Sequence, residues 1–273
     1  MITLLPVSDL HLDFLTSSFT EKKSMALYDR IIGVESDVLV IAGDLSHYIS
    51  QSKTFLSACS KHNKHVLFVP GNHELYNISD KQRAEYTTLT SKMDKLKNEV
   101  SHLTNVHILQ GDHVDIDGFR FAGAMGWYDC SYYYRCAQGL YTETVLSHWC
   151  SYTNDSRRIP TLNNPFDLFA TEKLLIDKAL ATEPDVMITH FCPISDPIAI
   201  EPRFQNDRGT GYYCFDYQQV LADISSRPAI WIHGHMHAHH EFHLGKTLHY
   251  RNPLGYPGEK SNFTTNQIIL EKP

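Results

Sequence analysis

The sequence lacks the features that would tie a chain to a membrane or build it around cysteine motifs. None of its six cysteines lies in a Cys-x-x-Cys pair, which excludes a zinc ribbon and a thioredoxin-type motif. No apolar run approaches the ~20 residues of a membrane span. The chain also starts without the basic and apolar segments of a signal peptide. We therefore expect a cytoplasmic protein with reduced thiols and no membrane contact.

Positive charge is also scarce. The chain carries 24 Lys and Arg against 31 Asp and Glu, a formal charge of −7. A protein that grips nucleic acid through its phosphates needs a basic surface, so general nucleic-acid binding is not expected. A small phosphorylated substrate remains compatible with this balance. No feature of the sequence indicates an oligomeric state.

The hydrophobic pattern predicts a single α/β domain over residues 1–273. Apolar, β-branched runs of strand length lie at 2–7, 37–42, 65–69, 106–109, 119–124, 186–189, 229–232, 247–250 and 267–270. Helical patterns cover 21–35, 79–100, 166–181 and 216–225. Strands and helices alternate over the first part of the chain, which is typical of a parallel sheet flanked by helices.

Residues 127–160 break this pattern because they are too long and too aromatic for a simple connector. We interpret them as an insertion or lid over the functional site. Two roles remain open for its aromatic side chains. They pack a small covering unit, or they line a pocket for a base or an aromatic leaving group.

Short patches of metal-binding residues follow the apolar runs. Because ligands gather at the carboxyl ends of strands in open α/β sheets, we expect these patches to meet. We expect Gly43 and Gly71 to let the backbone bend before the residues that follow. Nitrogen and oxygen donors without thiolate suit Mn, Fe, Zn or Co. The patches are Asp9-Leu-His11, Gly43-Asp44, Gly71-Asn72-His73-Glu74, Thr189-His190 and Gly234-His235-Met236-His237.

Taken in order, the patches read D-x-H, G-D, G-N-H-E, H and G-H-x-H, and this pattern resembles the calcineurin-like metallophosphoesterase superfamily. The resemblance spans residue 3 to about 257. It implies a four-layer αββα sandwich of two mixed sheets, with a dinuclear metal site at the carboxyl ends of the strands. The implied cofactors are two divalent ions (Mn, Fe, Zn, Ni or Co), of which we favour Mn.

The resemblance also implies roles for individual residues. One ion would be held by Asp9, His11 and His237, and the other by Asn72, His190 and His235. Asp44 would bridge both ions, and His73 would serve the leaving group. The implied reaction is hydrolysis of a phosphomonoester or phosphodiester, in which a hydroxide shared by the two ions attacks phosphorus.

Two differences from the pattern of this superfamily narrow the expected function. The second patch continues as GDLSHYI over 43–49, without the Asp-Arg-Gly of the protein Ser/Thr phosphatases. Phe191 stands where many small members have a second histidine. We therefore expect a small substrate or a diester rather than a phosphoprotein. The alternatives are a nuclease or cyclic-nucleotide phosphodiesterase on the same ions and, from another class, a non-catalytic scaffold.

Other polar residues receive weaker interpretations. Asp13 and Glu74 are expected to cap helices or orient imidazoles. His233 is expected in the core, and His239 and His240 in solvent. The candidates for a phosphate clamp are Arg203, Arg208 and Arg251. The segment 250–259 resembles the closing strand and loop of many bacterial members of the superfamily. Arg251 is favoured as a substrate-binding residue because it lies beside that closing loop, with Arg208 as the second candidate.

Overall fold

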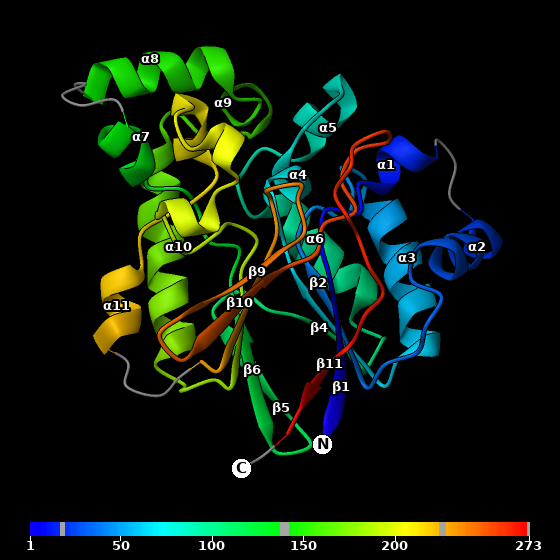
Figure 1. Cartoon of the computed structure of the whole chain (residues 1–273). Coiled ribbons are helices and arrows are strands. Elements are labelled where there is room, and N and C mark those ends of the chain that lie inside the picture. The colour runs from blue at the N-terminus through cyan, green and yellow to red at the C-terminus, as the bar shows by residue number, and fades with distance from the viewer. Residues whose placement is uncertain (17–19, 137–141, 224–227, 272–273) are drawn as a thin grey trace.

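Two β-sheets form the centre of the computed structural model, which describes residues 1–16, 20–136, 142–223 and 228–271 (Figure 1). The five-stranded sheet has the order β11 (Ile268–Leu270), β1 (Ile2–Val7), β2 (Val38–Ala42), β3 (His65–Val69) and β4 (Val106–Ile108). The six-stranded sheet has the order β5 (Asp112–Ile116), β6 (Phe119–Gly123), β7 (Val186–Ile188), β8 (Ile230–His233), β10 (Thr247–Arg251) and β9 (His240–Leu244). Both sheets are mixed: β11, β5 and β9 are antiparallel edges on otherwise parallel strands.

Helices cover the outer faces of both sheets, which confirms the four-layer αββα arrangement (Figure 1). The larger helices beside the five-stranded sheet are α2 (Glu21–Ile31), α3 (Ile49–His62) and α6 (Ser91–Val100). Those beside the six-stranded sheet are α10 (Pro165–Leu180) and α11 (Gln218–Asp223). The remaining short elements are α1 (Leu12–Leu15), α4 (Asn72–Leu75), α5 (Asp80–Glu85), η1 (Pro197–Ala199), η2 (Pro202–Phe204) and η3 (Arg208–Tyr212).

Strand β2 shows how the layers are held together. Every residue of the strand is buried. Val38 and Val40 pack in the core between the two sheets. Leu39 and Ile41 point the other way and join the core beneath the helices. Because side chains alternate along a strand, a continuous apolar run covers both faces of a sheet.

Some elements differ from the sequence prediction. The predicted helix over 79–100 is divided into α5 and α6, because the Thr-rich link at 87–90 is a poor helix former. Helix α3 was not predicted, since its buried face includes the polar Gln51 and Ser52 and its apolar period is weak. Strands β5 and β9 were also not predicted. They are mostly polar and form the outer edges of their sheet.

In its described residues, 127–136 and 142–160, the aromatic stretch contains three helices, α7 (Ser131–Cys136), α8 (Thr142–Tyr152) and α9 (Asp155–Arg158). Trp127, Tyr128, Tyr133 and Trp149 are buried in the same core as the strands and helices. Packing therefore accounts for many of the rings. Tyr152 differs from them, because 48% of its surface is exposed.

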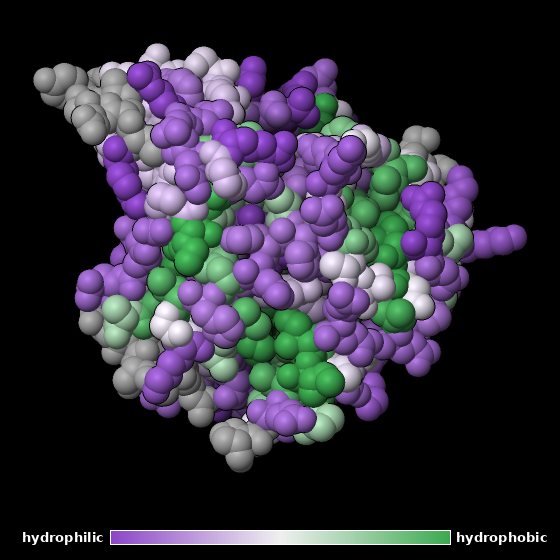
Figure 2. All heavy atoms as spheres, in the orientation of Figure 1, coloured by the Kyte–Doolittle hydropathy of each residue, from purple (hydrophilic) through white to green (hydrophobic). Residues whose placement is uncertain are grey.

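The surface turned toward the reader in Figure 2 is mostly hydrophilic, with apolar patches at its right side, at its left side and at its lower end. Met1 and Ile269, at the start of the chain and on edge strand β11, are the most exposed apolar residues near that end. Within the described residues, no helix combines the length and apolarity needed to cross a bilayer. The metal-binding patches lie at the opposite end of the strands, where β1, β2, β3, β7 and β8 terminate.

Candidate metal centre

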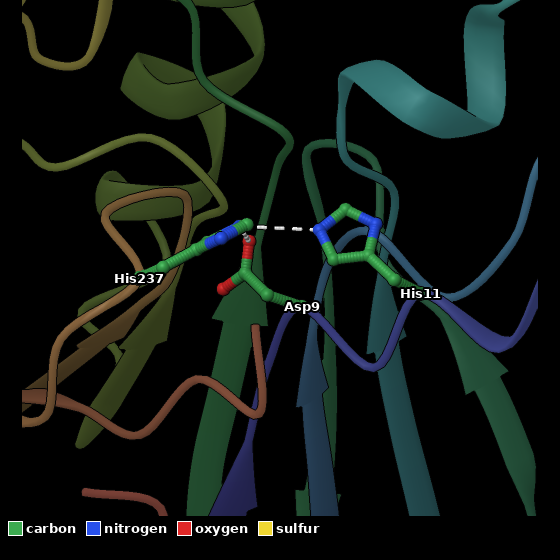
Figure 3. A group of neighbouring side chains, drawn as sticks. All are labelled: Asp9, His11 and His237. Carbon is green, nitrogen blue, oxygen red and sulfur yellow. Dashed lines mark hydrogen bonds and ion pairs between the residues drawn. The ribbon is translucent and has the colours of Figure 1, made fainter. Parts of the chain in front are cut away.

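The first ligand group joins the end of β1 to the loop after β8. The Nε2 atoms of His11 and His237 are 3.1 Å apart, and His237 Nε2 lies 3.4 Å from Asp9 Oδ1. Figure 3 shows Asp9 and His11 on the segment that follows β1 and His237 reaching toward them from another segment. Asp9 and His11 are fully buried. One metal ion could be held by this group.

The second ligand group joins β3, β7 and β8. His190 Nε2 lies 3.1 Å from His235 Nδ1 and 3.1 Å from Asn72 Oδ1. The carboxylate of Asp44 is 3.4 Å from His190 Nε2 and 3.8 Å from His11 Nε2 through the same Oδ2 atom. Asp44 therefore lies between the two groups, as the bridging role requires. The structure brings together every residue that the sequence predicted as a metal ligand.

The backbone at these ligands is strained. Asp9, His11, Asp44 and His235 have φ angles of 53°, 42°, 55° and 65°. Non-glycine residues rarely occupy this left-handed region, and strain of this kind gathers at functional sites. The turn after each strand thus aims the side chain across the gap between the sheets.

Two glycines give the ligands room. A Cβ atom at Gly43 would collide with the ring of His190, and one at Gly71 would collide with the carboxylate and backbone of Asp44. Gly43 also has a φ of 85°, as the predicted bend requires. Gly71 does not have a positive φ. A glycine is therefore needed there for space rather than for backbone bending.

Glu74 supports the site through backbone rather than through imidazoles. Its carboxylate accepts hydrogen bonds from the N–H groups of Asp44, Leu45, Ser46 and Gly71, at 2.6–3.0 Å. The expectation that Glu74 orients an imidazole is therefore wrong, although its capping role is correct. Asp13 does pair with an imidazole, that of His47, at 3.0 Å.

The buried carboxylates attract positive charge. Burial raises the pKa of Asp44, but His190 and His73 outweigh it and hold the pKa well below its ordinary value. Conversely, burial lowers the pKa of His190, and Asp44 more than reverses this and raises it to about 9. The pKa of His237 is raised to about 9, because Asp9 likewise outweighs the lowering effect of burial. These groups form an environment that favours a cation.

Ring tautomers provide a test of whether ions fit. His190 Nδ1 lies 2.9 Å from the carbonyl oxygen of Ala42 and donates to it, so that in the neutral ring the lone pair is on Nε2. His237 Nδ1 is bound in the same way by Glu259 at 2.6 Å. Two nitrogens that bind one ion at ~2.1 Å lie roughly 3.0–3.4 Å apart. The 3.1 Å approach within each imidazole pair therefore fits divalent ions.

Comparison with known proteins agrees with this geometry. The sequence matches the family described as calcineurin-like phosphoesterase over residues 2–239. The chain belongs to the calcineurin-like phosphoesterase family. Members of this family typically bind divalent metals, and the clustered His and Asp residues suit them.

Two known proteins align with this chain over nearly its full length. The uncharacterized protein L509 of Acanthamoeba polyphaga mimivirus is 24% identical over 284 residues, covering 96% of this chain and 94% of that protein. The solved structure of a phosphopantetheinyl hydrolase from Mycobacterium tuberculosis has a TM-score of 0.68 and 17% identity, covering 98% of this chain and 96% of that one. At this identity, the structural likeness establishes the shared fold.

The two arginines that were predicted to bind substrate lie in different places. Arg208 is exposed at the start of η3. Arg251 is fully buried at the end of β10, where Nε donates to the carbonyl of Ala238 at 2.7 Å. Its Nη2 has no hydrogen-bond partner among the described residues, and the residue borders the cavity described below. Substrate contact by either arginine remains a prediction.

Three histidines near the ligands take other roles. His233 is buried, with Nε2 3.9 Å from Cys192 Sγ, in agreement with a core position. His239 and His240 are half-buried rather than solvated. They contact Asn252 and the carbonyl of Ile198.

Several residues of the site were missed by sequence reasoning. Tyr256 stacks on His11 with ring centroids 4.3 Å apart, and its hydroxyl lies 3.1 Å from His73 Nε2. His47 stacks on His73 at 4.5 Å. Tyr256 belongs to the segment 250–259, which the resemblance had marked as a closing strand and loop. That segment was the only available signal.

A cavity of about 660 Å³ opens beside the ligands, next to Asp44, Asn72 and His73. Its walls include the rings of Tyr152, Tyr212, Tyr213, Phe204 and Tyr256. Tyr152 and its neighbours Thr153, Asn154 and Asp155 come from the aromatic stretch. Both predicted roles of that stretch therefore have support, since its rings fill the core and one end of it lines a cavity.

Proposed function

We propose that this protein is a metal-dependent hydrolase of phosphate esters with one reacting phosphate. The observation that carries the proposal is the pair of ligand groups that share Asp44. When bound, two divalent ions would neutralise phosphoryl oxygens and acidify a water molecule. The new bond joins a water oxygen to phosphorus, the bond to the leaving oxygen breaks, and that oxygen takes up a proton.

We propose that His73 assists the leaving oxygen. Its Nε2 lies 3.8 Å from Asp44 Oδ2, and its backbone N–H donates to Asp44 Oδ1 at 2.9 Å. Burial lowers the pKa of His73, Asp44 raises it, and His11 and His47 lower it again, so that it lies well below its ordinary value. The imidazole is therefore neutral near pH 7. It stabilises the leaving oxygen by donating a hydrogen bond.

The cavity favours an alcohol group without additional phosphates. Besides the ligand Asp44, four carboxylates line it, those of Asp155, Glu201, Asp207 and Glu259. The cavity also has three cations. Arg203 is paired with Glu201 at 2.7 Å, Arg251 donates to carbonyl groups through Nε and Nη1, and Lys260 is exposed. A second phosphate would meet negative charge, whereas a neutral ring or amide would pack against the tyrosines.

A diester with a neutral, extended arm belongs to the class that this cavity suits. The phosphopantetheinyl group is one example, and the name of the structural relative makes it a direct candidate to test. The nuclease alternative is less favoured because the cavity has no excess of positive charge to follow a nucleic-acid backbone.

The central experiment removes and restores the ions. Chelator-treated protein is reloaded with Mn, Fe, Zn, Ni, Co or Mg and assayed on p-nitrophenyl phosphate and bis-p-nitrophenyl phosphate. We expect hydrolysis only in reloaded protein, rising until about two ions per chain are bound. Asp44→Asn provides the control, because it removes the shared charge with little change in shape. Full activity in metal-free protein, or none with any ion, would overturn the proposal.

A second assay addresses the alcohol group. A nucleoside monophosphate, the matching triphosphate and a phosphopantetheinyl diester are compared at equal ion loading. We expect the triphosphate to have the lowest kcat/KM, since its extra charges face the cavity carboxylates. A clear preference for the triphosphate would contradict the substrate class and leave the reaction type standing.

A further inference from the structure

Asn72 can serve as a ligand only if its amide oxygen faces the second ligand group. The Oδ1 atom lies 3.1 Å from His190 Nε2, inside that group. The Nδ2 atom faces the other way and donates to Asp155 Oδ1 and to the hydroxyl of Tyr76, each at 2.9 Å. The amide is thus held at both of its ends.

Asp155 decides between the two orientations of that amide. A carboxylate only accepts hydrogen bonds, so the NH₂ end of Asn72 must face it. After a 180° flip, the amide oxygen would repel the carboxylate, and the NH₂ group would occupy the ligand position next to His190. The hydrogen-bond network therefore assigns the orientation.

Asp155 is itself held by buried donors. The hydroxyl of Tyr76 donates to Oδ1 at 2.5 Å, and that of Tyr128 donates to Oδ2 at 2.8 Å. Trp149 Nε1 donates to the Tyr128 hydroxyl at 2.6 Å. Asp155, Tyr76, Tyr128 and Trp149 are each at most 4% exposed. A buried network with satisfied members fixes its groups in one arrangement.

Three members of this network belong to the aromatic stretch over 127–160, namely Tyr128, Trp149 and Asp155. A separate backbone contact ties the same stretch to the segment after α4. There the N–H of Asn77 donates to the carbonyl of Arg158 at 2.7 Å. The stretch is therefore anchored next to Asn72 by two independent contacts.

The geometry points to Asp155 as a positioning residue that fixes Asn72 for the ion bound with His190 and His235. By this inference the aromatic stretch is a structural part of the metal centre as well as a wall of the cavity. The inference rests on the proposed function only in that ions bind at these two groups. It assigns Asp155 no contact with the reacting atoms.

The test measures the affinities of the two metal equivalents separately, by calorimetry and by Co²⁺ absorption. In Asp155→Ala, we expect the affinity of the site with Asn72 to fall roughly 10–100-fold, as is typical when a partner of a ligand is lost. The site built from Asp9, His11 and His237 should keep its affinity. Tyr128→Phe, which removes one donor to Asp155, should lower the metal affinity of the site with Asn72 by a smaller factor.

Glu172→Gln is the matched control. Glu172 also carries a buried carboxyl group, but its Oε2 accepts from the N–H of Gly126 at 3.0 Å rather than from Asn72. The Glu172→Gln variant should leave both metal affinities unchanged. Asp155→Asn, which keeps the shape and one acceptor, should lose an intermediate amount of affinity at the site with Asn72.

The inference is overturned if folded Asp155→Ala binds both equivalents as the native protein does, or loses both equally. Circular dichroism and the melting temperature establish whether Asp155→Ala is folded. If it is not, the same comparison is made with Asp155→Asn. Failure of the proposed function is a separate result. Native protein that binds two ions but hydrolyses no phosphate ester would refute the function and leave the role of Asp155 testable.

Discussion

His73 has contacts unlike those of the ligand histidines around it. Its ring stacks on His47 and meets the hydroxyl of Tyr256, and it lies 3.8 Å from the shared carboxylate of Asp44. The Nδ1 atom has no hydrogen-bond partner among the described residues. A neutral imidazole placed in this way can donate to an oxygen that enters the cavity.

Replacing His73 by alanine is expected to lower kcat by about 10²–10⁴-fold. The loss should be larger for an alkyl phosphate than for p-nitrophenyl phosphate, because the alkoxide needs more stabilisation as it leaves. Metal content should stay at the native value, since no ligand is removed. Steady-state kinetics on both substrates and metal analysis check this. Equal losses on both substrates would contradict a role at the leaving oxygen.

At the scale of elements, each ligand loop depends on close backbone approach. Gly71→Ala would place a methyl group against the carboxylate and backbone of Asp44. We expect a loss of about 1–3 kcal/mol in the free energy of unfolding, together with weaker metal binding. Urea denaturation and metal titration measure the two effects.

Gly245→Ala provides the contrast for that experiment. Its Cβ would meet nothing within 4 Å, but its φ is 59°. It should destabilise the fold by about 1–2 kcal/mol through backbone strain and leave the metal affinities unchanged. If both variants weakened metal binding alike, the steric explanation for Gly71 would be wrong.

Helix α10 carries a buried acid that makes stability depend on pH. Burial raises the pKa of Glu172 to about 8, against a smaller lowering by hydrogen bonds from Gly126 and Met125. The folded protein therefore keeps a proton that the unfolded chain releases above its ordinary value of 4.5. This contribution is complete below that value and is lost as the pH rises through about 8.

Comparison of Glu172→Gln with native protein isolates this effect. Between pH 5.5 and 8.5, we expect the native free energy of unfolding to fall more than that of the variant, by on the order of a few kcal/mol. Urea denaturation at both pH values measures the difference. Parallel pH profiles would show that the carboxyl titrates normally.

For the whole molecule, bound ions should join the two sheets. One ligand group combines β1 with the loop after β8, and the other combines β3, β7 and β8. Ions that bind only the folded state stabilise it by about 2.7 kcal/mol per site at 100-fold excess over Kd. Chelation should therefore lower the melting temperature. In Asp44→Asn, chelation should lower the melting temperature by less than it does in native protein. An equal decrease in both proteins would contradict a shared site.

Much of the fold follows from sequence pattern because buried parallel strands are locally encoded. Strand β2 is buried on both faces, and its run of apolar residues can be recognised without any partner. Strands β5 and β9 could not be recognised in this way. They are polar edges that become strands by pairing with β6 and β10. Helix α3 could not be predicted, because its buried face includes the polar Gln51 and Ser52, whose burial depends on tertiary contacts.

The ligand candidates could be named from the sequence alone, because short patches such as His235-Met236-His237 match the pattern of a known family. Only the tertiary structure decided what surrounds them. Asp155 is 83 residues from Asn72, and Tyr256 is 183 residues from His73. Such pairs leave no local pattern, because the contact is made when two sheets pack and a distant helix docks. The sequence therefore specified the metal-binding groups, and the packing of the two sheets and the aromatic stretch determined how those groups are oriented.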